Sequence, residues 1–303
     1  MSNRFISWAV FVLLCFIWGS SFILMKMGKT TLTAAEIAAI RIFSAGIIFV
    51  PTAIYHLRKI SGKKLWIIII AGFFGNLLPA FLFAEAVIKL DESAIVGILN
   101  SLTPIFVAIL GTIFFKDKIE RRKIVGIIIG FVGLCLLTLA KGDVSLDNLG
   151  YASLVLLATI SYGLNVNIVS HYLSDKTPMQ VSSVSLAFMA IPCAVILYNA
   201  GFLDLDFSSP SLQLSLFATV LLGIVGSSIA TVLFYFLVQK AGGLFASLVT
   251  YGIPFVAVMW GVIDHEEVRP LEVVSLGIIL FGVYLANRKK KESEVPQAPK
   301  GEE

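Results

Sequence analysis

Long apolar stretches separated by short polar gaps dominate the sequence. There are ten, covering roughly residues 6–26, 34–55, 65–89, 94–115, 123–140, 150–172, 179–200, 211–239, 244–263 and 271–287. A helix needs about 20 apolar residues to cross the hydrocarbon core of a bilayer. The pattern therefore predicts an all-α integral membrane protein with ten transmembrane helices, and the gaps are too short to hold an extramembrane domain.

The composition agrees with a membrane protein. Hydrophobic residues make up 58% of the chain and charged residues 14%, whereas an average globular chain has about 45–50% and about 25%. The three cysteines lie within apolar stretches, so we expect neither a disulfide nor a metal site. The first apolar stretch is longer than the hydrophobic region of a signal peptide, and we expect it to be retained as a helix.

Basic residues lie mostly in alternate gaps. If the N-terminus is placed in the cytoplasm, the cytoplasmic segments carry 17 of the 23 Lys and Arg residues and the outside loops carry 5, while Arg41 lies inside a span. Cytoplasmic loops of membrane proteins carry an excess of basic residues. We therefore expect both termini in the cytoplasm, a location in the plasma membrane (the inner membrane of a bacterium), and a disordered cytoplasmic tail at 288–303.

An interrupted apolar phrase occurs twice. TPIFVAILG (103–111) and IPFVAVMWG (253–261) both place a glycine seven residues after a proline. GFFG at 72–75 corresponds to GIVG at 223–226 in the same register, apart from a one-residue insertion. The chain therefore reads as two copies of one unit.

Two five-helix repeats follow from this correspondence, one at 6–140 and the other at 150–287. Because five is odd, the second repeat must cross the membrane in the opposite sense, which is the inverted-repeat architecture of many secondary transporters. Interrupted helices at matching positions mark the central site in such folds, and Pro104 and Pro254 are the candidate helix breaks. Each proline removes a backbone donor, although a membrane-helix proline can also serve packing alone.

Several local sequences resemble a known family. They are WGSSF near the start, IRIFSAG (40–46), AIVGILNSLTPIFVAILG (94–111) and DKIERRKIVG (117–126). With them the chain resembles the EamA family of the drug/metabolite transporter superfamily. The resemblance implies ten helices around a central cavity and export or exchange of small metabolites. The glutamate that usually follows the fourth span in this family is Asp117 here, and Glu266 or Glu267 fills its place in the second repeat.

Polar and aromatic side chains at corresponding positions of the two repeats are the predicted lining of this cavity. They are Trp18, Ser21, Asn76, Asn100, Ser101, Tyr162, Asn165, Ser227, Thr231, Tyr235, Thr250 and Tyr251. Asparagine amides offer a donor and an acceptor together, which suits solute binding. The alternative for the serines and threonines is hydrogen bonding between helices.

Arg41 and Glu85 are ionisable side chains inside spans, and such residues are functional candidates. Both lie a few residues below the outer ends of their helices, at similar depth. We expect them to form an ion pair that acts either as a structural clamp or as a gate and proton-coupling site. The third possibility is that the two side chains do not meet.

The function that these features favour is secondary transport. We expect an exporter of a small metabolite, an amino acid or a related compound, that works by alternating access. No HExxH, GxSxG or P-loop motif is present, so we expect no enzyme activity, no cofactor and no nucleic-acid partner. The alternative is an intramembrane enzyme acting on lipid-linked substrates. The expected partners are a small solute and the lipid bilayer, and a homodimer is left open.

Overall fold

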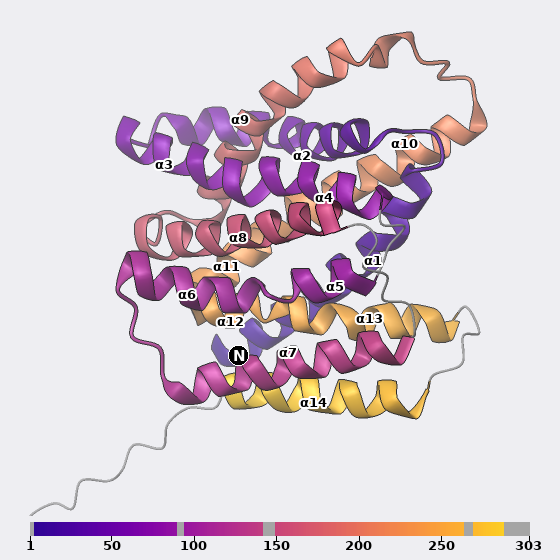
Figure 1. Cartoon of the computed structure of the whole chain (residues 1–303). Coiled ribbons are helices and arrows are strands. Elements are labelled where there is room, and N and C mark those ends of the chain that lie inside the picture. The colour runs from indigo at the N-terminus through magenta and orange to yellow at the C-terminus, as the bar shows by residue number, and fades with distance from the viewer. Residues whose placement is uncertain (1–2, 90–93, 142–148, 264–268, 288–303) are drawn as a thin grey trace, which may run out of the picture.

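The computed structural model describes residues 3–89, 94–141, 149–263 and 269–287. Within these ranges ten helical stretches are long and apolar enough to cross a membrane, which confirms the predicted number of spans. Most of the helices run side by side along one direction (Figure 1). The predicted disordered tail at 288–303 lies outside the described residues.

Six of the ten spans are continuous helices. They are α1 (Asn3–Gly28), α2 (Ala34–Leu57), α7 (Arg121–Lys141), α8 (Leu149–Tyr172), α9 (Pro178–Asn199) and α14 (Pro270–Asn287). A short 3₁₀ turn, η2 (Phe202–Asp204), follows α9.

The other four spans are interrupted, and they are the third, fourth, eighth and ninth. Their helices are α3 (Gly62–Gly72) and α4 (Leu78–Lys89), α5 (Ala94–Asn100) and α6 (Thr103–Phe115), α10 (Pro210–Gly223) and α11 (Ala230–Ala241), and α12 (Gly243–Ser247) and α13 (Val249–Ile263). The third and eighth spans each contain a π-helical turn, η1 (Phe73–Leu77) and η3 (Ile224–Ile229). Interruptions therefore occur at the same places in the two halves of the chain.

The second and seventh spans begin with the same local structure. Thr33 and Glu36 form a capping box at the start of α2, and Thr177 and Gln180 form one at the start of α9. In each, the threonine side chain accepts a hydrogen bond from a backbone N–H that has no partner inside the helix. These boxes give a register of 144 residues between the two helices (177 minus 33).

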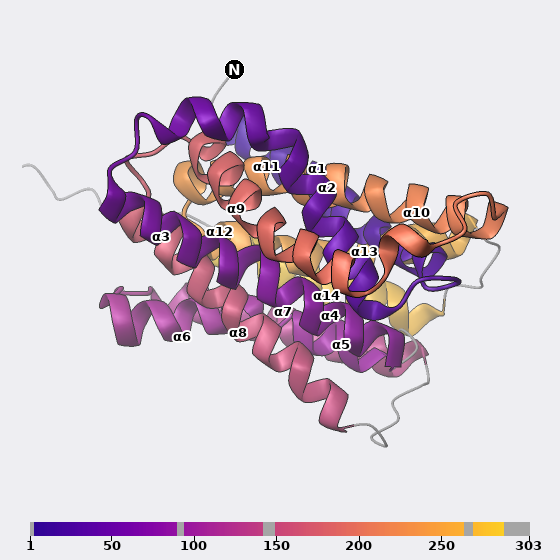
Figure 2. The ribbon, with the colours of Figure 1, turned by 90° about the horizontal axis from the view of Figure 1, so that it is seen from above.

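Packing between the helices follows a two-fold pattern. The second span packs against the seventh (α2 and α9), and the fifth packs against the tenth (α7 and α14). The contact of α6 with α8 is matched by that of α13 with α1, and the contact of α4 with α8 is matched by that of α10 and α11 with α1. Figure 2, the view from above, again shows α6 beside α8. Elements of one half are therefore packed mainly against elements of the other.

Large apolar side chains cover the outside of this bundle. Ile113 and Phe114 on α6 are 64% and 68% exposed, and Phe217 on α10 is 62% exposed. A soluble monomer rarely exposes large contiguous apolar patches. The outer surface is therefore the kind of surface that hydrocarbon chains solvate.

Candidate functional site

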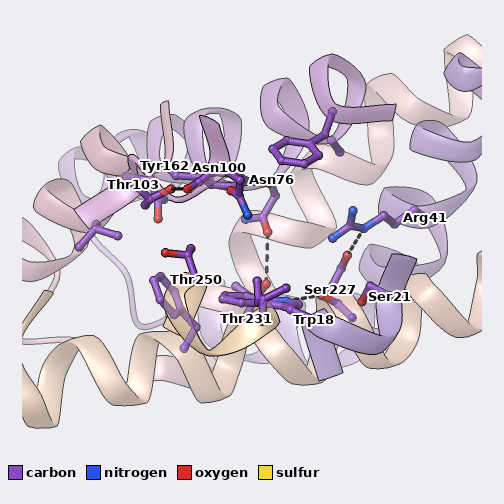
Figure 3. Close-up of a pocket in the computed structure, with 18 of the residues that line it drawn as sticks. Trp18, Ser21, Arg41, Asn76, Asn100, Thr103, Tyr162, Ser227, Thr231 and Thr250 are labelled. Atoms are coloured by element: carbon purple, nitrogen blue, oxygen red, sulfur yellow. Dashed lines mark hydrogen bonds between the residues drawn. The ribbon is translucent and has the colours of Figure 1, made fainter. Parts of the chain in front are cut away.

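A cavity of ≈ 130 Å³ lies between the two halves of the chain. Ten of the twelve predicted cavity residues line it, and Figure 3 shows several of them around the open space. They are Trp18, Ser21, Asn76, Asn100, Tyr162, Asn165, Ser227, Thr231, Tyr235 and Thr250. All four interrupted spans contribute to this lining, together with α1, α2 and α8.

Residues missed by the sequence reading also line the cavity, and most of them are apolar or small. They are Met25, Ile42, Gly75, Ala80, Phe83, Thr103, Val166, Gly226, Phe234, Ser247 and Ile253. Helical spacing could have found some of them, because residues three or four positions apart share a helix face. Ala80 lies four residues after Asn76, and Thr103 lies three after Asn100.

Two predicted lining residues, Ser101 and Tyr251, are absent from the lining. Ser101 follows the last residue of α5, and the Tyr251 hydroxyl donates to the carbonyl oxygen of Ile127 on α7 at 2.9 Å. The prediction took consecutive residues in pairs, Asn100 with Ser101 and Thr250 with Tyr251. Successive helical residues are about 100° apart, so Thr250 faces the cavity while Tyr251 faces α7. Ser101 lies in the turn after α5, where its hydroxyl donates to the Ile98 carbonyl oxygen.

The two prolines occupy different positions relative to the helix breaks. Pro104 lies in the first turn of α6, where its missing N–H costs no intrahelical bond. The carbonyl oxygen of Asn100, one turn earlier, accepts a hydrogen bond from the Thr103 hydroxyl at 2.7 Å. Pro254 lies inside α13, and the break in its span falls earlier, at Leu248. Neither proline is part of the lining. Both spans are interrupted, as predicted, but the two prolines do not occupy equivalent positions at the interruptions.

The π-helical turns are the more closely matched interruptions. Gly75 and Asn76 of η1 and Gly226 and Ser227 of η3 all line the cavity. A π turn lengthens the backbone hydrogen bond from i+4 to i+5 and is frequent at functional sites. GFFG and GIVG, already recognised as a repeated phrase, are the sequences in which these turns occur, although their π geometry could not be read from them.

Backbone carbonyls just before η1 and within η3 accept hydrogen bonds from side chains of the opposite half. Asn165 Nδ2 on α8 donates to the Ala71 carbonyl oxygen at 2.6 Å, and Trp18 Nε1 on α1 donates to the Gly226 carbonyl oxygen at 3.0 Å. A Cβ atom at Gly75 would overlap the Asn165 amide, so glycine is required there by the close approach. Each half thus holds the π turn of the other.

Two further side-chain hydrogen bonds lie in the cavity wall. Asn165 Nδ2 also donates to the Tyr235 hydroxyl oxygen at 3.1 Å. The Thr231 hydroxyl donates to Asn76 Oδ1 at 3.2 Å (Figure 3). Asn76 is only 8% exposed, yet its Nδ2 has no hydrogen-bond partner among the described residues. A buried donor without a partner is costly, and this one belongs to a cavity residue.

Arg41 does not pair with Glu85 within the described part of the chain. Instead, Arg41 Nε donates to Ser227 Oγ at 2.7 Å, and Glu85 is not part of the lining. The two side chains were expected to meet because they lie at similar depth in the membrane, but depth does not determine the direction in which a side chain points around its helix. Glu85 follows the lining residue Phe83 by two positions, about 200° around α4. The predicted ion pair is therefore corrected, while a proton-coupling role for Glu85 stays a prediction.

By the register that the capping boxes give, Ser185 occupies the position in the second half that Arg41 occupies in the first (41 plus 144). The packing agrees with this pairing: Gly223 approaches the backbone of Arg41, and Gly72 approaches Ser185. The Ser185 hydroxyl donates to a carbonyl on its own helix, that of Ser182. The two halves thus share a backbone arrangement at this point, but only the first half carries a charge there.

Asp117, which replaces the expected glutamate, lies away from the cavity at the end of α6. Its Oδ1 is 2.9 Å from Nε2 of His171 at the end of α8, and the His171 ring is tilted against Phe115. Glu266 and Glu267 lie outside the described residues. Within the described residues no group of three or more His, Cys, Asp or Glu is placed to hold a metal ion.

Comparisons with known proteins agree with this architecture. The sequence profile of the EamA-like transporter family matches residues 6–139 and again residues 149–288. An uncharacterized transporter of Archaeoglobus fulgidus is 29% identical over 93% of this chain and 99% of its own length. The uncharacterized inner membrane transporter YedA of Escherichia coli K12 is 27% identical over 90% of this chain and 88% of its own.

A solved crystal structure has the same fold. It superposes with a TM-score of 0.71 at 16% identity and covers 92% of this chain and 96% of its own. The fold, the ten apolar helices and the two profile matches, which together span most of the sequence, lead to one conclusion. The chain is a multi-pass membrane protein that belongs to the EamA-like transporter family.

Proposed function

We propose that this protein is a secondary transporter of a small metabolite, an amino acid or a related compound. The solute binds in the cavity between the two halves, which rock about it to expose it to one side of the membrane and then to the other. The observation that carries this proposal is the lining itself, because all four interrupted spans meet there. Export is the direction that the family resemblance implies.

An inverted arrangement of the two halves supports alternating access. The strongest contacts between elements of the two halves have counterparts with the roles exchanged, such as α6 with α8 and α13 with α1. Five spans in each half require opposite orientations, and the distribution of basic residues favours cytoplasmic termini. Rocking of two such halves around a fixed central site is the usual form of alternating access.

The size and polarity of the cavity favour a small solute. A cavity of about 150 Å³ holds a benzene molecule, so ≈ 130 Å³ admits a compound with the bulk of a small amino acid. Aromatic surface from Trp18, Tyr162 and Phe234 accompanies the amides in the lining. No carboxylate is among the described lining residues, so we propose that the gradient of the solute drives transport.

The test compares two neighbouring residues, one inside the cavity and one outside it. Wild-type protein, Asn100→Ala and Ser101→Ala are reconstituted in vesicles and assayed for uptake of a mixture of radiolabelled amino acids. Asn100→Ala should lower the initial rate several-fold because its amide faces the cavity. Ser101→Ala should transport like the wild type, because its hydroxyl donates to a backbone carbonyl of its own turn, that of Ile98.

Equal rates for the two variants would contradict the proposed binding site. If the wild-type protein moved no member of the mixture, transport of amino acids would be refuted. If a lipid-linked compound added to the vesicles were then chemically altered by the protein, the enzyme alternative would replace transport.

A further inference from the structure

The cavity carries one positive charge, and none of the described residues that line it carries a negative one. Arg41 is the one ionisable Lys, Arg, Asp, Glu or His side chain among the described residues that line it. A charged side chain inside the membrane is costly unless it is paired. The guanidinium of Arg41 donates to the hydroxyl of Ser227 and forms no ion pair with a carboxylate of the described residues. The charge of Arg41 is therefore open to a partner from outside the protein.

The guanidinium group is fixed in place and still has donors to offer. Its Nε is bound to Ser227 Oγ, and its two terminal nitrogens make no hydrogen bond to the described residues. Those nitrogens are also not among the buried, unpartnered atoms, so they reach the cavity space. Figure 3 shows Arg41 extending from α2 toward Ser227, on the side of the space that Asn76 also borders.

Asn76 is a second polar residue in the wall of this cavity. Its Oδ1 is held by the Thr231 hydroxyl, which leaves Nδ2 as the free end of the amide. That Nδ2 is buried and has no acceptor among the described residues. Arg41 thus presents N–H donors directly to the cavity space, an arrangement that suits a solute with acceptor oxygens, whereas the Asn76 Nδ2 is buried in the cavity wall.

We propose that the cavity recognises a solute through a single carboxylate group, which the terminal nitrogens of Arg41 bind. This inference rests on the proposed transport function and names its substrate class. A guanidinium presents a planar fork that matches the two oxygens of a carboxylate. A phosphate group carries more charge than one arginine balances, so the carboxylate is the better match.

The experiment uses purified full-length protein and matched pairs of small compounds. The probes are leucine with leucinamide, lactate with lactamide, and benzoate with benzamide, so that each pair keeps its carbon skeleton and exchanges a carboxylate for an amide. Binding is titrated by tryptophan fluorescence, since Trp18 lines the cavity, and by the shift in melting temperature. At least one carboxylate should bind, and its amide partner should bind at least about tenfold more weakly.

Variants assign the effect to Arg41. Arg41→Gln should weaken carboxylate binding about tenfold or more, and Arg41→Lys should fall between the two because it keeps the charge but loses the fork. Arg58→Gln is the matched control, since Arg58 lies just beyond the end of α2 and outside the lining. It should bind like the wild type.

A second variant covers the case in which Arg41→Gln fails to fold. Asn76→Asp keeps the side-chain shape and brings a carboxylate into the cavity, where it competes with the solute for Arg41. It should abolish carboxylate binding in a protein that melts as a single species.

Three comparisons would overturn the inference if they gave the following results. They are equal binding of carboxylates and amides, unchanged carboxylate binding by folded Arg41→Gln, and stabilisation by inorganic phosphate or chloride as strong as that by any carboxylate. A wild-type protein that binds none of the carboxylates also contradicts it. Transport itself is judged separately, because Asn100→Ala can still lower vesicle uptake of an uncharged solute when the carboxylate assignment is wrong.

Discussion

Gly223→Ala is the substitution whose effect the structure defines most sharply. Gly223 is the last residue of α10 and has ordinary helical dihedrals, φ −63° and ψ −51°, so its backbone does not require glycine. What requires it is the approach of α2. A Cβ atom at this position would lie 2.5 Å from the carbonyl oxygen of Arg41 and closer still to Ser44 Oγ.

The magnitude follows from three contributions. Forcing an extra methyl group into a packed contact costs about 1–3 kcal/mol. Loss of the hydrogen bond from the Ser44 hydroxyl to the Arg41 carbonyl, 3.1 Å long, costs about 0.5–1.5 kcal/mol more if the hydroxyl must move. Alanine regains about 0.5–1 kcal/mol over glycine in a helix. The net loss of unfolding free energy is therefore about 0.5–4 kcal/mol, with a midpoint of about 2 kcal/mol.

Thermal unfolding of purified protein measures this loss. At about 2–4 °C per kcal/mol, Gly223→Ala should lower the melting temperature by several degrees. Gly277→Ala is the control, because this exposed glycine of α14 has open space where its Cβ would be, and alanine there should leave melting unchanged or raise it slightly. If Gly223→Ala melted at or above the wild-type temperature, the close packing of α2 against the start of η3 would be refuted.

Three further substitutions test other contacts. Tyr251→Phe removes a buried hydroxyl that donates to a carbonyl of α7. It should cost about 0.5–1.5 kcal/mol of unfolding free energy and leave solute binding unchanged. Weaker solute binding would show that Tyr251 belongs to the binding site. Thr231→Val keeps the side-chain shape but removes the hydrogen bond to Asn76 Oδ1. Titration of the protein with solute should show weaker binding. Unchanged binding would mean that this hydrogen bond does not orient the Asn76 amide. The hydrogen bond from Lys64 holds the pKa of the Asp175 carboxyl below its usual value, so the stability from this pair is fully present above about pH 4 and is lost as the pH falls through the lowered value. Because the Asp175 side chain is about half exposed, Asp175→Asn should cost at most about 1 kcal/mol at pH 7, and a cost that persists at low pH would contradict the assignment.

The sequence was sufficient for the number of spans, since the length and composition of each apolar stretch determine it. It also identified most of the polar side chains of the cavity lining, because the two repeats carry polar groups there at corresponding positions, whereas it missed most of the apolar and small residues. The role of these ten residues in binding a solute stays a prediction.

What the sequence left undetermined is mostly the direction in which each side chain points around its helix axis. Depth along a helix follows from counting residues, but the direction of a side chain around the axis depends on the packing partners. Glu85 was matched to Arg41 by depth and faces elsewhere, while Tyr251 was matched to Ser101 by repeat register and both face away from the cavity. The π turns shift the helix face locally, and no residue in GFFG or GIVG alone requires such a turn.

The most direct test of the account asks whether the cavity opens to both sides of the membrane. Thr250→Cys is introduced after Cys15, Cys135 and Cys193 have been replaced by alanine, and a membrane-impermeant maleimide is applied to intact cells and to inside-out vesicles. Ser101→Cys, outside the lining, serves as the control. Alternating access predicts that the cysteine introduced at position 250 reacts from both sides and that the control reacts from neither. Reaction from one side alone under every condition would contradict transport through this cavity.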